Sequence, residues 1–240
     1  MRTEPWVSRI PTLHKLGVPA PVDVDHVLIG KNWLDAFAAC VRENNIEGIL
    51  SLVCDDALWR DVLTLTWDIR TFDGAAKIRR FLCDRLSLAK MHEFKLKEPP
   101  TLQNLWSDLI WIVGMFDFRT DVGLGSGVFR LVPTRDGQWK AYTIFTNLED
   151  LKAFPELTGS RRSHDVLTSG TWVQRRREET EFVQSDPSVL VIGGGHNALA
   201  LAARLKYLNV RALIVDKEER IGNSWRNRYE NLTLHFPVCE

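Results

Sequence analysis

Near the C-terminal end of the sequence, a short apolar run leads directly into three consecutive glycines. The run Ser188–Ile192 (SVLVI) has the composition of a buried parallel strand, and Gly193–Gly195 follows it without a gap. The first glycine permits a tight turn out of the strand, and the third lets the backbone approach a phosphate closely because it has no Cβ. Ala198 occupies the next position where a small residue is needed, so that a helix can lie on the sheet. This spacing predicts a strand, a phosphate-binding loop and a helix in immediate succession.

The residues that follow complete the pattern of a dinucleotide-binding unit. Asn197–Leu208 is rich in Ala and Leu and predicts a helix whose first N–H groups and positive dipole end face the phosphates. Arg211–Val215 predicts a second strand. Asp216 stands at its end, about 20 residues after the glycines, where a carboxylate can accept hydrogen bonds from both ribose hydroxyls. A glycine-rich turn without a ligand does not account for strand, helix, strand and acid in register. We therefore expect a partial α/β Rossmann-type unit over residues 188–240.

The segment after Asp216 distinguishes FAD from NAD. Asp216, Gly222 and Trp225 are spaced as in the motif E-x5-G-G-x-W, with Asn223 in place of the second glycine. This spacing, and the run WRNRYENLTLHFP that continues it, resembles the flavin-containing monooxygenases and Baeyer–Villiger monooxygenases over residues 188–237. The resemblance implies that the dinucleotide is FAD.

The resemblance also implies a role for each residue of the unit. The two motif glycines and Ala198 would lie along the FAD pyrophosphate, and Asp216 would hold its adenosine ribose. Trp225 and Arg226 would approach the flavin, although a core tryptophan that fixes the loop to the sheet is an equal interpretation of Trp225. At His196 the backbone N–H matters more than the ring, because the residue begins the helix. The predicted cofactor-binding residues are Gly193, Gly194, Gly195, His196, Asn197, Ala198, Asp216, Lys217, Gly222, Trp225 and Arg226. No catalytic residue and no metal ligand is predicted.

The activity implied by this family is FAD- and NADPH-dependent monooxygenation of a small organic substrate. Its members bind NADPH through a second glycine motif further along the chain. The sequence contains no second G-x-G-x-x-G and no monooxygenase fingerprint F-x-G-x-x-x-H. We therefore expect an N-terminal fragment that is not catalytically complete, with NADPH expected only in a full-length relative. The alternative is a non-catalytic module that carries a vestigial nucleotide-binding unit.

Before this unit, the period of the apolar residues changes from helices to strands. Residues 25–41 repeat at three- and four-residue steps, which predicts a helix capped by Asp23 or Asp25. Asn44–Asn45 ends that helix. The further predicted elements are a helix over 46–52, a strand over 57–70, a helix over 74–88, and strands over 92–97, 108–119, 123–133 and 139–146. This order predicts an α+β domain over residues 25–150, with helices on one face of a curved antiparallel sheet.

The element order, with a helix that enters as Trp33–Phe37 (WLDAF), resembles the cone-shaped domains of nuclear transport factor 2-like, or SnoaL-like, proteins. The resemblance implies an apolar pocket for a small molecule between sheet and helices, and a possible homodimer. The candidate pocket residues are Asp61, Asp68, Trp59, Trp67 and Trp111. The favoured alternative is that the tryptophans belong to the core and the aspartates lie at strand edges or turns, since no His–Asp or Tyr–Asp couple stands out.

The composition limits the classes of binding partner and the cellular compartment that we expect for this protein. Lysine and arginine total 31, as do aspartate and glutamate, so the balance offers no attraction for nucleic acid or anionic lipid. None of the four cysteines forms a C-x-x-C pair, which favours reduced structural thiols. Residues 1–24 predict a proline-broken extended arm without a signal peptide, and residues 151–187 a linker with a charged helix over 171–183. No run approaches the roughly 18 apolar residues of a membrane span, so we expect a cytoplasmic protein.

Overall fold

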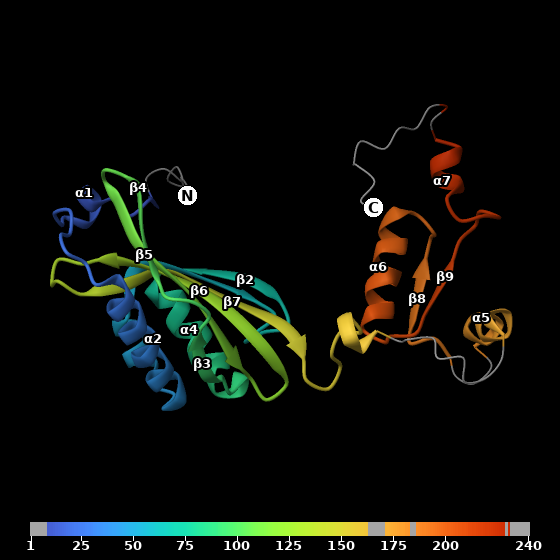
Figure 1. Ribbon diagram of the computed structural model, residues 1–240, viewed down its shortest axis with the longest axis horizontal. Coiled ribbons are helices and arrows are strands. Elements are labelled where there is room, and N and C mark those ends of the chain that lie inside the picture. Colours follow the sequence, from blue (N-terminus) through green and yellow to red (C-terminus); the bar gives the residue numbers. More distant parts are fainter. Residues whose placement is uncertain (1–8, 163–170, 183–185, 229, 231–240) are drawn as a thin grey trace. The chain divides into compact units, whose positions relative to one another are not determined.

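The computed structural model describes residues 9–162, 171–182, 186–228 and 230. The chain divides into two compact units, Met1–Ala153 and Phe154–Glu240 (Figure 1). Each unit has its own secondary structure. The N-terminal unit contains a seven-stranded sheet, and the C-terminal unit contains a two-stranded one.

Three helices of the N-terminal unit lie against one face of its curved sheet (Figure 1). They are α2 (His26–Arg42), α3 (Ile46–Ser51) and α4 (Ala75–Ala89). Asp25 caps α2, because its side chain accepts a hydrogen bond of 3.0 Å from the N–H of Leu28. Asn45 caps α3 in the same way through the N–H of Gly48, at 2.8 Å. The side-chain oxygens satisfy N–H groups that have no partner within the helix, which explains why both helices begin where they do.

The sheet joins an antiparallel meander to a parallel pair. Its strands are β1 (Val53–Val62), β2 (Ile69–Asp73), β3 (His92–Leu96), β4 (Thr101–Trp106), β5 (Leu109–Arg119), β6 (Gly123–Pro133) and β7 (Trp139–Leu151). They lie in the order β2-β1-β7-β6-β5-β3, and β4 also pairs with β5. Strands β5, β6 and β7 are antiparallel neighbours, whereas β1 runs parallel to β7. The predicted fold class, helices on a curved and largely antiparallel sheet, is confirmed.

The prediction of a single strand over residues 57–70 is wrong. The chain turns between β1 and β2, and Leu63 adopts a left-handed backbone with φ of 60°, a conformation that residues other than glycine rarely adopt. The N–H of Leu63 donates to the carbonyl of Asp68 at 3.1 Å, which closes the turn. Its residues are apolar and β-branched, so their composition resembles a strand. The polar group that fixes the turn, Asp61, lies inside the predicted strand and gives no local signal.

Two whole elements of the N-terminal unit, α1 (Leu13–Leu16) and β4, are absent from the predictions. The segment predicted as an extended arm contains the short helix α1, and the N–H of Leu13 donates to the carbonyl of Asp108 at 2.8 Å. Strand β4 was absent from the predicted elements. Nearly all of its side chains are exposed, and it includes the polar residues Gln103 and Asn104, so it lacks the alternation of a half-buried strand.

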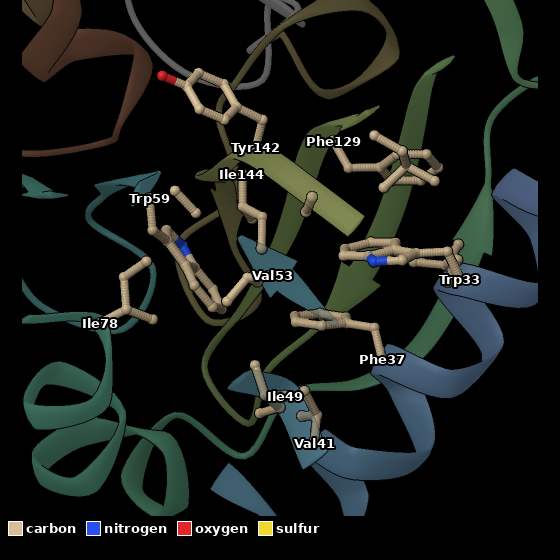
Figure 2. Close-up of a cluster of buried hydrophobic side chains, with 14 of the residues drawn as sticks. Trp33, Phe37, Val41, Ile49, Val53, Trp59, Ile78, Phe129, Tyr142 and Ile144 are labelled. Carbon is tan, nitrogen blue, oxygen red and sulfur yellow. The ribbon is translucent and has the colours of Figure 1, made fainter. Parts of the chain in front are cut away.

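Aromatic side chains fill the space between the helices and the sheet (Figure 2). Trp33 and Phe37 project from α2, with ring centroids 5.2 Å apart. Trp33 meets Phe129 of β6 at 4.7 Å, and Phe37 meets Trp59 of β1 at 5.8 Å. All four side chains are buried. The resemblance placed an apolar pocket between the sheet and the helices. Around these four side chains that space is filled by the protein's own aromatic rings.

The C-terminal unit is built around a parallel strand pair. Its elements are η2 (Gly159–Arg161), α5 (Trp172–Glu181), β8 (Val189–Ile192), α6 (His196–Tyr207), β9 (Ala212–Val215) and α7 (Asn223–Arg226). Strands β8 and β9 pair in parallel from Val189↔Ala212 to Ile192↔Val215. Figure 1 shows α6 beside these two strands, as the crossover of a strand–helix–strand unit requires. This part of the predicted fold class is also confirmed. In neither unit is any described helix long and apolar enough to cross a membrane.

Candidate functional site

The glycine loop follows β8 and opens α6. Gly193 has φ of 101°, a conformation that side chains rarely adopt, and its N–H donates to the carbonyl of Val215 at 2.7 Å. Gly195 is different, because its φ of −78° suits any residue. A Cβ placed on Gly195 would meet no other protein atom within 4 Å. Neither the backbone nor the packing of the described chain requires glycine at this position, so its smallness leaves room for something outside the chain.

The N-terminus of α6 is free of any capping side chain. Gly195 is the N-cap residue, and no acidic residue lies in the first turn. The first N–H groups of a helix have no partner within it and carry the positive end of its dipole. Open space beside Gly195 together with these donors fits a phosphate or pyrophosphate group. The residues present therefore fit a dinucleotide on the donor side.

Asp216 is brought to the loop on the acceptor side. One carboxylate oxygen accepts a hydrogen bond from the N–H of Gly194, and the other accepts one of 2.7 Å from the N–H of Glu218. These two bonds, that of Gly194 first, hold the pKa of Asp216 below its ordinary value of 3.8. A carboxylate offers about four lone-pair sites, so each oxygen keeps one for a further donor such as a ribose hydroxyl. A Cβ on Gly194 would lie 3.1 Å from the carboxylate oxygen, which accounts for the middle glycine.

The downstream motif returns to the same loop. Gly222 has φ of 86° and caps α7, so the glycine is required there by the backbone. Trp225 lies on α7, and its ring meets that of His196 edge-on, with centroids 6.2 Å apart. Arg226 donates to the carbonyl of Ile221 at 3.0 Å and so fixes the turn before α7. The structure therefore brings Trp225 to the start of α6, while Arg226 has a local structural contact.

The remaining predicted residues take simpler places. Ala198 is half-buried in the first turn of α6, and Asn197 is exposed beside it. Lys217 is exposed next to Asp216 and contributes a small lowering of its pKa. The part of the family resemblance carried by Tyr229 and residues 232–237 lies outside the described residues.

The structure does not bring together the five candidate pocket residues of the N-terminal unit. Trp59 belongs to the buried core. Trp111 lies on β5, where its indole N–H donates to Gln103 at 2.9 Å and its ring lies 5.4 Å from the guanidinium of Arg130. Trp67 and Asp68 lie on the turn between β1 and β2 and line a surface hollow.

Asp61 is fully buried and holds the turn between β1 and β2 through hydrogen bonds. It accepts hydrogen bonds from the N–H groups of Leu65 and Thr66, at 3.1 and 3.2 Å. The hydroxyl of Thr146 donates to it at 2.7 Å and accepts from the indole of Trp59 at 3.1 Å. Burial outweighs these bonds and raises the pKa of the Asp61 carboxyl. Of the favoured alternative, the core position holds for Trp59 but not for Trp67, which is 71% exposed, and Asp61 lies fully buried on β1 rather than at an edge or in a turn.

Comparison with known proteins gives two partial relatives, and no protein-family model matches the chain. An uncharacterized CzcO-like oxidoreductase from Geobacillus kaustophilus (strain HTA426) is 51% identical over 49 residues, which are 20% of this chain and 14% of that protein. Indole-3-pyruvate monooxygenase YUCCA1 from Oryza sativa subsp. japonica is 35% identical over 57 residues, 22% of this chain and 14% of that protein. The chain thus spans about one seventh of the length of either curated relative.

Among solved structures, the similar ones cover about half of this chain at low identity. Nuclear transport factor 2 from Cryptosporidium parvum is 17% identical with a TM-score of 0.40, over 55% of this chain and 100% of that chain. A ketosteroid isomerase-like protein from Erwinia carotovora atroseptica SCRI1043 is 9% identical with a TM-score of 0.40, over 52% and 96%. An NTF2-like protein of unknown function from Pseudomonas putida KT2440 is 15% identical with a TM-score of 0.41, over 52% and 87%.

Proposed function

We propose that residues 188–228 bind the ADP half of FAD, as the first nucleotide-binding unit of an NADPH-dependent monooxygenase that acts on a small organic substrate. The observation that carries this proposal is the meeting of the Asp216 carboxylate with the glycine loop at the open N-terminus of α6. When bound, FAD supplies two-electron redox chemistry and reactivity toward O2. The two partial relatives, one named an oxidoreductase and the other a monooxygenase, support the class of reaction.

The chain's own residues would divide the work of binding. The first N–H groups of α6 donate to the pyrophosphate, and Gly195 leaves the space through which it approaches. Asp216 accepts the hydroxyls of the adenosine ribose on its remaining lone pairs. The edge-on pair of His196 and Trp225 borders the loop at the start of α6. NADPH is expected only where a second nucleotide-binding unit accompanies this one.

Incubation of the purified chain with FAD, followed by gel filtration, tests the proposal directly. We expect the protein fraction to carry flavin absorbance and quenched flavin fluorescence, and FAD to bind more tightly than NADH. NADPH oxidation in the presence of O2 is then measured separately. No retained flavin, or tighter binding of NADH, would contradict the assignment of FAD. Retained flavin without NADPH oxidation would confine the function of this chain to cofactor binding.

Substitution of Asp216 is expected to weaken FAD binding without removing it. Asp216→Ala removes the ribose acceptor and releases the N–H of Gly194, so we expect a loss of about tenfold or more in affinity. Glu219→Gln is the matched control, since it removes an exposed carboxylate three residues away on the same segment. Fluorescence titration with FAD measures both variants. Equal affinity of Asp216→Ala and Glu219→Gln would exclude a role of Asp216 in binding.

The same carboxylate sets an expected pH dependence. Because its pKa is lowered in the folded state, its hydrogen bonds are fully present above the ordinary value of 3.8 and are lost as the pH falls through the lowered pKa. We expect the Asp216-dependent part of FAD affinity to be constant between about pH 5 and 8 and to fall only in stronger acid. A decline of that part between pH 8 and 6 would contradict this assignment.

A further inference from the structure

We infer that a hollow at one end of the N-terminal unit binds a small aromatic molecule that carries a single anionic group, such as a carboxylate. The hollow has a volume of about 580 Å³, within the range of roughly 300–1,000 Å³ that is usual for small-molecule sites. Three segments form it: the β1–β2 turn (64–68, with residue 70), the C-terminal turn of α4 (85, 88 and 89) and the β5–β6 turn (120–122). All three belong to the N-terminal unit, so the inference does not rest on the FAD proposal.

Three large apolar side chains in the lining of the hollow are strongly exposed. Trp67 is 71% exposed, Leu88 is 68% exposed and Val122 is 52% exposed, and each comes from a different segment. Leu65, which is buried, also contributes to the lining. Single exposed apolar side chains are common, but large ones that gather around one concavity mark a surface that binds something. The flat face of an exposed indole favours an aromatic partner.

The charges of the hollow leave one cation available. Asp68 pairs with Arg70 at 2.8 Å, and Asp121 pairs with Lys90, just outside the lining, at 2.7 Å. Arg85 also lines the hollow, and within the described parts of the chain its guanidinium forms no ion pair and no hydrogen bond. A guanidinium offers two parallel N–H groups to a carboxylate, so the charge that complements this hollow is a single anionic group.

The turn that carries Trp67 contains two features that are unfavourable in free energy, a left-handed residue and a buried carboxylate. Leu63 has a left-handed backbone, which is unfavourable for a branched apolar side chain. Asp61 is a buried carboxylate, and its hydrogen-bond partners are uncharged. Strain and buried charge of this kind persist only where the surrounding structure fixes them, and they gather at ligand sites. The exposure of Trp67 is therefore a maintained feature of the turn.

The packed core places the ligand at the rim of the cone. Trp59 and Phe37, whose rings are 5.8 Å apart, occupy the interior next to the turn. Neither ring belongs to the lining of the hollow, which Leu65 and the turn form on this side. The hollow shares Trp67 and Asp68 with the pocket expected from sequence, but that pocket lay between the sheet and the helices and also included Asp61, Trp59 and Trp111.

A pair of fluorescent probes tests the inference on the full chain. 1-Anilinonaphthalene-8-sulfonate carries an aromatic body and one anionic group, and N-phenyl-1-naphthylamine has the same body without the charge. We expect Arg85→Gln to weaken binding of the anionic probe about tenfold and to leave the neutral probe within about twofold. Arg80→Gln is the matched control, because Arg80 is also exposed on α4 but lies outside the hollow. That control should bind both probes as the parent chain does.

A second pair of variants distinguishes an aromatic contact in the hollow from nonspecific binding of the probes to exposed apolar side chains. Trp67→Ala should weaken both probes at least fivefold, whereas Trp106→Ala, which removes another exposed indole outside the hollow, should weaken neither. Circular dichroism and thermal unfolding establish that each variant is folded. Probe binding that does not depend on Arg85 and Trp67 would overturn the inference. So would an equal loss in Arg80→Gln or Trp106→Ala, since that result would assign the probes to the surface at large.

Discussion

Replacement of Gly195 by valine is expected to abolish FAD retention while the chain stays folded. The φ of −78° at this residue is ordinary for valine, and a Cβ there would meet no protein atom within 4 Å. The new side chain would instead occupy the space through which a pyrophosphate reaches the first turn of α6. We expect the affinity for FAD to fall at least about 100-fold, because close backbone approach is what this glycine provides.

A graded series makes this prediction sharp. Gly195→Ala adds only the Cβ and should lie between the parent chain and Gly195→Val in FAD affinity. Ala203→Val, which adds the two methyl groups by which valine exceeds alanine at an exposed site further along α6, should bind FAD normally. Flavin titration and far-ultraviolet circular dichroism measure binding and fold in parallel. A Gly195→Val protein that binds FAD within threefold of the parent would exclude this loop as the pyrophosphate site.

Gly193 and Gly195 are both motif glycines, but glycine is needed at the two positions for different reasons. At Gly193 the φ of 101° requires glycine for the fold alone, with or without a ligand. At Gly195 nothing in the fold requires it. The sequence motif treats the two alike, and only the backbone conformation separates a structural glycine from one reserved for a ligand. Gly193→Ala is for that reason the poorer test, since it would change the loop and the site together.

Features that depend on local order were predictable from sequence. The three- and four-residue repeat of α2, its cap at Asp25 and the break at Asn45 are encoded within a few residues of where they act. The spacing from the glycine loop to Asp216 was informative for a similar reason. A strand, a helix and a second strand of fixed lengths leave little freedom in where the acid arrives, and its carboxylate indeed meets Gly194.

Features that depend on distant residues were not predictable. The β1–β2 turn is fixed by Asp61 and by Thr146, which are 85 residues apart in sequence, and no local pattern announces their contact. The hollow is formed by three segments, around residues 67, 88 and 122, that come together only through the pairing of the sheet. Arg85 gave no signal in the sequence, because a cation on a helix face is usually solvated, and its significance lies in the apolar neighbours that folding supplies.

Removal of the Asp61 carboxylate is expected to have the largest effect on stability of any single substitution considered for the N-terminal unit. Asp61→Ala leaves the N–H groups of Leu65 and Thr66 and the hydroxyl of Thr146 without their acceptor. Buried groups that lose their partner cost about 1–3 kcal/mol each, so we expect a loss of about 3 kcal/mol or more in the free energy of unfolding. Urea unfolding of the N-terminal unit measures it.

Two comparisons identify the carboxylate as the cause and supply a pH signature. Asp55→Ala, at an exposed position of the same strand, should change the free energy of unfolding by less than about 0.5 kcal/mol. Asp61→Asn keeps one acceptor and should lose about 1–2 kcal/mol.

Burial raises the pKa of Asp61 above its ordinary 3.8, so the folded state binds the proton more readily than the unfolded state. The stability that this group contributes therefore rises as the pH falls through the raised pKa toward 3.8. Since asparagine does not titrate, the advantage of the parent chain over Asp61→Asn should grow on acidification within that window, and an advantage that shrinks there would contradict the raised pKa.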